Sequence, residues 1–235
     1  MKSVWHLLVA AALVITSCGG AAPATTLPPD AGTVLAAAAQ AMGAIDYVRF
    51  KIERTGAPVY IDPAHTLNFK VAEGQFAAPS SANAVVTLAV GNLNAQIGAI
   101  AINGKTWLTN PISGNWEDAP EGYEFNPATL FDPDVGWRPL LAEGLSNVQW
   151  IGEEQHNGEN RYHIRAAADE DRVALILAGL IEKQPVDLDM WIDPATGYVR
   201  EAELSTIYEG QTSDWHIEFS EFGQPVAITP PDTGS

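Results

Sequence analysis

The chain has 235 residues, of which 46% are apolar and 9% aromatic, enough for one sizeable packed domain. It carries 12 Lys and Arg against 29 Asp and Glu, a formal net charge of −17 at pH 7. So acidic a surface repels phosphate groups, which argues against nucleic acid as a partner and against broad electrostatic docking on an anionic membrane.

The N-terminal stretch has the pattern of a secretory signal that ends at a cysteine. Lys2 supplies a basic start, and the apolar run 7–14 is too short to cross a bilayer as a permanent helix. The residues before Cys18 resemble the lipobox of bacterial lipoproteins, in which a cysteine is acylated and becomes the new N-terminus. Cys18 is the chain's only cysteine, so the alternative is a stray buried thiol. We predict a signal peptide over residues 1–17 and a lipid anchor, such as palmitate, on Cys18 at the extracytoplasmic face of the bacterial cell membrane.

Small and Pro-rich segments bound the predicted domain. After the cysteine, residues 18–29 are small, uncharged and rich in Pro, too poor in large apolar groups to fold, and are predicted to form a flexible tether. Residues 226–235 are predicted to form a flexible, polar tail. One domain is expected over residues 30–225, and no later stretch is apolar enough for a transmembrane span.

The domain is predicted to begin with a helix and to continue with antiparallel strands. Asp30 can cap a helix over residues 33–42, which Gly43 ends. Its apolar stripe is expected to consist of Leu35, Ala38, Ala39 and Met42. The apolar period then changes to two over residues 47–53 and 67–71, which predicts half-buried strands with one face in water.

The middle strands differ from their neighbours. Residues 84–90 and 93–102 are predicted strands joined at a Gly91-Asn92 hairpin turn, and Asn103-Gly104 is a second turn that leads into residues 105–108. Apolar residues fall on both faces of these middle strands. They are therefore covered on both sides or line an apolar space.

The second half begins with a long irregular stretch, residues 110–139, that is rich in aromatic residues. A bland surface loop would be polar, so this stretch is expected to fold over an apolar surface. A short second helix that Gly144 ends is predicted within residues 135–145. A hairpin with strands over residues 148–152 and 161–167 follows.

A third helix is predicted over residues 170–183, capped by Asp169. Its apolar residues cover more than half of its circumference, so it is expected to be almost wholly enclosed. The predicted last strands cover residues 186–193, 198–208 and 214–222. The element order predicts an α+β domain.

The sequence carries no recognisable catalytic or metal-binding pattern. Residues 144–148 lack the second glycine that a nucleophile elbow requires. The five histidines do not follow metal-ligand spacing. Asp187 and Asp189, or the glutamates of the hairpin 153–159, could bind calcium loosely, but neither has the spacing of an oxygen cage. We expect no catalytic residue, no metal, no cofactor and no enzymatic activity.

The segment Phe131-Asp132-Pro133-Asp134-Val135-Gly136 is followed by Leu140-Leu141-Ala142, a pair of strands, the Leu-rich third helix and the strand over residues 186–193. This order resembles the actinobacterial LppX/LprG-type lipoproteins over roughly residues 30–225. The resemblance implies a strongly curved antiparallel sheet, a half barrel, whose concave face is covered by helices with a hydrophobic cavity between. It also implies a carrier of lipid or acylated glycolipid across the cell envelope, related to periplasmic lipoprotein carriers, with a membrane transporter or other envelope protein as a possible partner.

The alternation and the resemblance together predict which side chains line that cavity. They are Phe50, Phe69, Val71, Val86, Leu88, Ile97, Ile100, Phe131, Leu140, Leu141, Ile164, Leu177, Ile181, Met190 and Leu204. A carrier makes physical sense because each CH₂ exposed to water costs about 0.8 kcal/mol. The acidic surface should favour neutral or cationic headgroups, unless a local cation such as Arg138 reverses that preference.

Three other interpretations stay open from the sequence. The apolar groups could fill one another in an ordinary close-packed core. The chain could be a non-catalytic envelope lipoprotein, structural or sensory, that binds a protein partner through the aromatic stretch. It could also be an envelope hydrolase whose site has no recognisable motif.

Overall fold

The structure is a computed structural model that describes residues 28–62, 64–119, 126–177, 180–181, 184 and 186–233. Its strands are β1 Tyr47–Gly56, β2 Asn68–Ala77, β3 Ser81–Val90, β4 Leu93–Ile102, β5 Lys105–Thr109, β6 Trp116–Asp118, β7 Leu145–His156, β8 Glu159–Ala168, β9 Val186–Ile192, β10 Val199–Tyr208 and β11 Gln211–Ser220. Its helices are α1 Ala31–Met42, the 3-10 helix η1 Pro127–Phe131, α2 Trp137–Glu143 and α3 Glu170–Ile176. The predicted signal peptide, Cys18 and most of the predicted tether lie outside the described residues.

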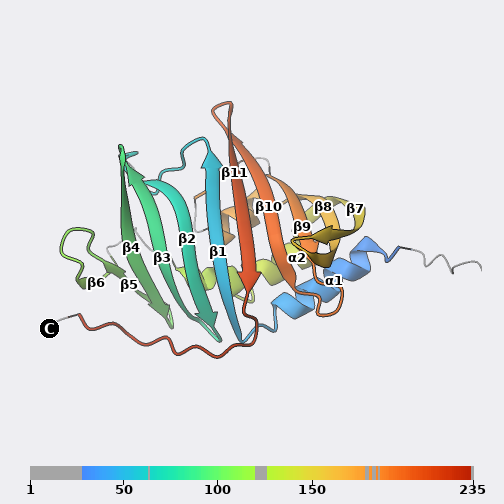
Figure 1. Cartoon of the computed structure of the whole chain (residues 1–235), viewed down its shortest axis with the longest axis horizontal. Coiled ribbons are helices and arrows are strands. Elements are labelled where there is room, and N and C mark those ends of the chain that lie inside the picture. Colours follow the sequence, from blue (N-terminus) through green and yellow to red (C-terminus); the bar gives the residue numbers. More distant parts are fainter. Residues whose placement is uncertain are drawn as a thin grey trace, which may run out of the picture.

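The described strands form one antiparallel sheet in the order β6-β5-β4-β3-β2-β1-β11-β10-β9-β8-β7. The sheet is strongly curved and open, and the helices lie on its concave side (Figure 1). Strands β1 and β11 pair at the centre, which joins the N-terminal and C-terminal halves of the chain. The predicted α+β half barrel with helices on the concave face is confirmed.

Alternation along the strands decides which side chains face the helices. In β1, Val48, Phe50 and Ile52 are buried on the concave face. Lys51 and Glu53 lie between them in sequence and stand on the opposite, outer face, where they form an ion pair of 2.9 Å. Because a strand has a period of two, the same alternation continues across the neighbouring strands and gives the sheet one apolar and one polar face.

Aromatic side chains join the helices to the sheet. Phe131 of η1 contacts Phe76 of β2 and Phe219 of β11, with ring centroids 4.7 and 5.6 Å apart. Trp137 of α2 meets Phe219 edge-on at 5.4 Å. This part of the aromatic stretch therefore folds over an apolar surface as predicted, while residues 120–125 lie outside the described part. The prediction missed the short strand β6, which also comes from this stretch.

Side-chain caps fix where the helices begin. Asp30 accepts a hydrogen bond from the backbone N–H of Thr33 at 2.8 Å and starts α1. Asp169 caps α3 in the same way, accepting from the N–H of Arg172 at 2.9 Å. Both caps were predicted. The predicted ends of α1 at Gly43 and of α2 at Gly144 are confirmed as well.

The third helix is shorter than the sequence predicted. It ends at Ile176 with Leu177 as its C-cap, and it has seven residues. Val173 and Ile176 are buried, but Leu175 is 50% exposed, so the prediction of an almost wholly enclosed helix was wrong. The apolar run continues past the end of the helix, and the core also includes Leu177 and Ile181, neither of which is helical.

A buried carboxylate orders the connection between β1 and β2. Asp62 accepts hydrogen bonds from the N–H of Leu67 at 2.6 Å, from the N–H of Thr66 at 2.9 Å and from the Thr66 hydroxyl at 2.7 Å. Burial alone would raise the pKa of Asp62, but these hydrogen bonds favour the charged form more strongly and lower its pKa below the ordinary 3.8. The loop is therefore held by an ionised carboxylate.

A glycine allows close packing inside the sheet. A Cβ at Gly74 would overlap the carbonyl oxygen of Asn83 and lie 2.5 Å from Cζ of Phe50. The Phe50 ring, which is fully buried, therefore occupies the space that any larger residue at position 74 would need.

The C-terminal residues run as an extended segment below the ends of the central strands (Figure 1). Val226 and Ile228 are half-buried there. The flexibility of residues 226–235, like the other domain bounds, stays a prediction. Among the described helices, none has both the length and the apolar character that crossing a bilayer requires.

Candidate functional site

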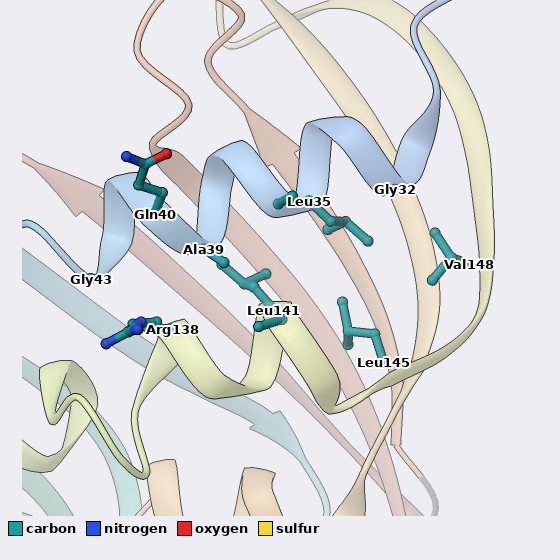
Figure 2. Close-up of a pocket in the computed structure, with 11 residues that line it drawn as sticks. Gly32, Leu35, Ala39, Gln40, Gly43, Arg138, Leu141, Leu145 and Val148 are labelled. Atoms are coloured by element: carbon teal, nitrogen blue, oxygen red, sulfur yellow. The ribbon is translucent and has the colours of Figure 1, made fainter.

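A groove of about 550 Å³ lies between α1 and α2, where the chain enters β7. This volume falls in the range of about 300–1,000 Å³ that small-molecule sites occupy. Its lining residues are Gly32, Leu35, Ala36, Ala39, Gln40, Gly43, Arg138, Leu141, Ala142, Leu145 and Val148, most of which Figure 2 labels.

Most of the residues that line the groove are apolar, and Gln40 and Arg138 are the polar exceptions. Leu35 and Ala39 of α1 face Leu141 of α2 (Figure 2), and all three are buried. Ala36 and Ala142 form the exposed rim of the two helices. Because the side chains on α1 are so small, the two helices can run side by side and still leave space for an apolar guest.

The two ends of the groove differ. Leu145 and Val148 of β7 stand beside Gly32 at one end (Figure 2), and Val148 is 37% exposed. This end lies at the first turn of α1, the turn that follows the predicted tether. It offers apolar surface to the solvent.

Arg138 stands at the other end, next to Gly43 (Figure 2). Its stem rests on the glycine, because a Cβ at Gly43 would lie 2.6 Å from Cδ of Arg138. The guanidinium forms no ion pair with any described residue. On so acidic a chain, an unpaired guanidinium beside an apolar groove is suited to an anionic group.

Among the described residues, none of those that line the groove carries a carboxylate, thiol, hydroxyl or imidazole. Its side chains therefore supply neither a nucleophile with a base nor the ligands of a metal ion. What the groove can do chemically is hold an elongated apolar group and pair its charged end with Arg138.

The predicted cavity wall is for the most part the core of the domain. These side chains belong to the core or pack against it: Phe50, Phe69, Val86, Leu88, Ile97, Phe131, Leu140, Leu141, Ile164, Leu177, Ile181, Met190 and Leu204. One space between the sheet and the helices is lined by described residues alone and lies around Phe69, Leu130 and Leu177. Its volume is about 10 Å³. That is about enough for one water molecule at most, so the described interior there is closely packed.

Two predicted wall residues lie on the outer face instead. Val71 pairs with Glu53 and Thr87 because the register of β2 shifts between Phe69 and Val71, where Lys70 is an extra residue. Such a bulge reverses the alternation that follows it.

Ile100, which was predicted to line the cavity, lies on the outer face for a simpler reason than Val71 does. It lies three residues after Ile97 in the same strand, and an odd spacing puts two side chains on opposite faces. Ala99 and Ala101, its neighbours in β4, are the residues that face the interior, and both are fully buried.

The groove itself was not predicted. Leu35 and Ala39 were expected on the buried stripe of the first helix, but no local pattern indicates that α1 and α2 lie together. The sequence signal that was present is the run of small residues on α1, since such residues leave space beside a neighbouring helix.

Fold and groove together define a class of protein: a single open, curved sheet that carries helices and an apolar groove on one side and a polar surface on the other. The chain belongs to the LppX_LprAFG lipoprotein family, whose model matches residues 30–228.

Relatives and solved structures agree with this family. The chain is 24% identical over 155 residues to proteins named lipoarabinomannan carrier protein LprG from Mycobacterium tuberculosis and Mycobacterium bovis. These matches cover 65% of this chain and 64% of each relative, just under two thirds of their length.

The fold is similar to that of LprF from M. bovis, with a TM-score of 0.65 at 16% identity over 87% of this chain and 98% of that one. It is also similar to the M. tuberculosis lipoprotein LppX, with a TM-score of 0.57 at 12% identity over 85% of this chain and 98% of that one. At such low identity these structures support the fold alone.

Proposed function

We propose that this protein is a lipid-anchored carrier on the extracytoplasmic face of the cell membrane, which binds the acyl part of a lipid or glycolipid and moves it across the envelope. The observation that carries the proposal is the groove between α1 and α2, whose lining is mostly apolar and includes Arg138, a cation that has no ion-pair partner among the described residues. Membership of a lipoprotein family, with relatives named as lipoarabinomannan carriers, supports the same function.

The energetics favour a carrier that needs no catalytic residue. A sixteen-carbon chain in water costs on the order of 12 kcal/mol, at about 0.8 kcal/mol per CH₂. Walls of Leu, Ala and Val remove most of that cost when they enclose the chain. The release of lipid from a membrane then becomes faster without any bond being made or broken.

The anchor would hold the groove close to its source of lipid. Asp30 comes twelve positions after the predicted anchor Cys18, and such a segment spans at most about 40 Å when extended. It joins the domain at the first turn of α1, beside the exposed apolar end of the groove. A chain leaving the membrane would meet this end first.

Arg138, at the end of the groove opposite Val148, affects which lipid headgroup the groove prefers. The acidity of the chain favours neutral or cationic lipids, but among the described residues that line the groove the charged side chain is Arg138. We therefore propose an anionic or phosphate-bearing headgroup, with its charge against Arg138 and its chain toward Val148.

Lipid extraction from the purified protein, read by mass spectrometry, tests the proposal, together with transfer of a fluorescent phospholipid between vesicles. Ala36→Trp places an indole at the rim of the groove and should remove most of the copurified lipid and of the transfer activity. Ala37→Trp is the matched control, because Ala37 is an exposed residue of the same helix that does not line the groove. Its lipid content and activity should stay those of the wild type.

Three results would contradict the proposal. The wild type could contain no extractable lipid and transfer none, which would favour a lipoprotein that binds a protein partner. Ala36→Trp and Ala37→Trp could behave alike, which would place the lipid elsewhere; Ala142→Trp repeats this test from the opposite helix. Finally, Arg138→Glu could leave the ratio of phosphatidylglycerol to phosphatidylcholine transfer unchanged, which would refute the headgroup assignment alone.

A further inference from the structure

The outer face of the sheet gathers histidines that are far apart in sequence. His216 of β11 lies between Glu53 of β1 and Glu203 of β10, because these three residues are partners across adjacent strands. Glu201 is two residues before Glu203 on the same face. The hairpin between β7 and β8 brings His156 to the same place, 45 residues from Glu201 in sequence.

Glu201 is the buried centre of this cluster, with only 9% of its side chain exposed. One carboxylate oxygen lies 2.7 Å from Nε2 of His216, and the other lies 2.7 Å from Nε2 of His156. The amide of Asn157 donates a further hydrogen bond to the second oxygen at 2.8 Å. Both oxygens of one buried carboxylate thus face imidazole nitrogens that could bind a metal ion.

The charges around His216 are out of balance. Besides Glu201, the carboxylates of Glu218 and Glu53 lie 3.7 and 3.9 Å from its ring nitrogens. Among these carboxylates, Glu53 forms an ion pair with Lys51 at 2.9 Å. Arg161, which also attracts Glu201, is itself paired with Glu159 and Asp193. The described groups therefore leave an excess of negative charge.

We propose that Glu201, Glu203 and His216 form a binding site for a divalent transition-metal ion such as Zn²⁺. One ligand atom from each of the three lies within 4.8 Å of the others. A tetrahedral zinc centre with bonds of about 2.0–2.2 Å needs ligand atoms roughly 3.4 Å apart, so small rotations of the exposed Glu203 and the half-exposed His216 close the geometry. Imidazole nitrogen with carboxylate oxygen selects zinc and its neighbours over calcium, which takes oxygen ligands.

The surroundings suit a metal ligand at position 216. When Nε2 of His216 binds the ion, its ring proton moves to Nδ1, which faces Glu53. A carboxylate that accepts the other ring N–H is the usual support for a metal-bound histidine. His156, on the second oxygen of Glu201, is itself stacked on Trp191 with ring centroids 4.2 Å apart. Glu201 would therefore connect an ion at this site to His156, at the tip of the hairpin between β7 and β8.

Titration calorimetry of the full chain in detergent with ZnCl₂ at pH 7.5, after treatment with a chelator, tests the site. We expect one zinc ion per chain and a higher melting temperature with zinc, because binding to the folded state stabilises it. Calcium at the same concentration should change neither.

Glu203→Gln and His216→Ala identify the ligands. Loss of a supporting residue typically weakens metal binding by roughly ten- to a hundredfold, and loss of a ligand should cost at least as much. His65→Ala is the control, a histidine outside the cluster whose removal should leave the zinc affinity unchanged. If His216→Ala fails to fold, Glu203→Gln decides, since that side chain is exposed. The proposal is refuted if zinc does not bind, or binds the wild type and the folded variants equally.

Discussion

Leu88→Trp tests whether the interior between sheet and helices is closely packed. Leu88 lies on the concave face of β3, is 2% exposed and pairs across the sheet with Phe69. The space beside Phe69 measures about 10 Å³, too little for the additional atoms of an indole. Overpacking a core typically costs 1–3 kcal/mol, and at roughly 2–4 °C per kcal/mol for a domain of this size we expect the melting temperature to fall by about 2–12 °C.

The measurement is thermal unfolding followed by far-UV circular dichroism, after delipidation of every variant, because bound lipid would raise the melting temperature by mass action. Val85→Trp is the matched control, on the outer face of the same strand and 48% exposed, and it should melt close to the wild type. A Leu88→Trp protein with an unchanged melting temperature would refute the reasoning. The interior would then have room for an indole, and the acyl chain would belong there rather than in the groove.

Three further predictions concern the anchor, the loop and the sheet. Cys18→Ala should move the protein from the membrane fraction to the soluble fraction; sedimentation with membranes as before would exclude this anchor. Asp62→Asn should lower the melting temperature at pH 7 by roughly 3–12 °C, since hydrogen bonds to a charged group contribute about 1.5–3 kcal/mol. Because the pKa of Asp62 is lowered in the folded state, the contribution of its charge to stability is lost as the pH falls below about 4. The difference in melting temperature between variant and wild type should therefore narrow below about pH 4 and not above it. Gly74→Ala should destabilise the domain by about 1–3 kcal/mol in urea unfolding, whereas Gly152→Ala, where a Cβ meets nothing within 4 Å, should not; equal stability of the two would show that the strands around position 74 adapt freely.

Local signals in the sequence predicted the element order well. Asp30 and Asp169 cap their helices because a cap depends on residues three positions apart. The Asn103-Gly104 turn joins β4 and β5, with a positive φ at both residues, as its sequence predicts. These features need no information from the rest of the chain.

The predictions were wrong where a distant contact or a single inserted residue decides which face a side chain lies on or where an element ends. Nothing in the alternation of β2 indicates that Lys70 is bulged, since the bulge is defined only against β3. The third helix was extended past Ile176 because its apolar residues continue, although Gly179 follows in the sequence. An apolar run indicates burial, and it does not by itself indicate a helix.

Neither candidate site could be predicted from local sequence patterns, because each depends on contacts between segments that are distant in the sequence. The groove depends on how α1 meets α2, which are separated in the sequence by strands β1 to β6. The pairing of His216 with Glu203 requires the register of β10 against β11, and His156 arrives from a third hairpin. Sequence spacing alone therefore gave no metal pattern, although the residues are neighbours in the fold.

The open sheet also affects how the size of the interior is set. A closed barrel fixes its radius through its strand number and stagger. Here the circle is interrupted between the short edge strand β6 and the bulged edge strand β7. Neighbouring strands can change their mutual twist while every ladder hydrogen bond is kept, so the radius of curvature is free to vary. Proteins with this topology can therefore differ in the width of their interior without gaining or losing a strand.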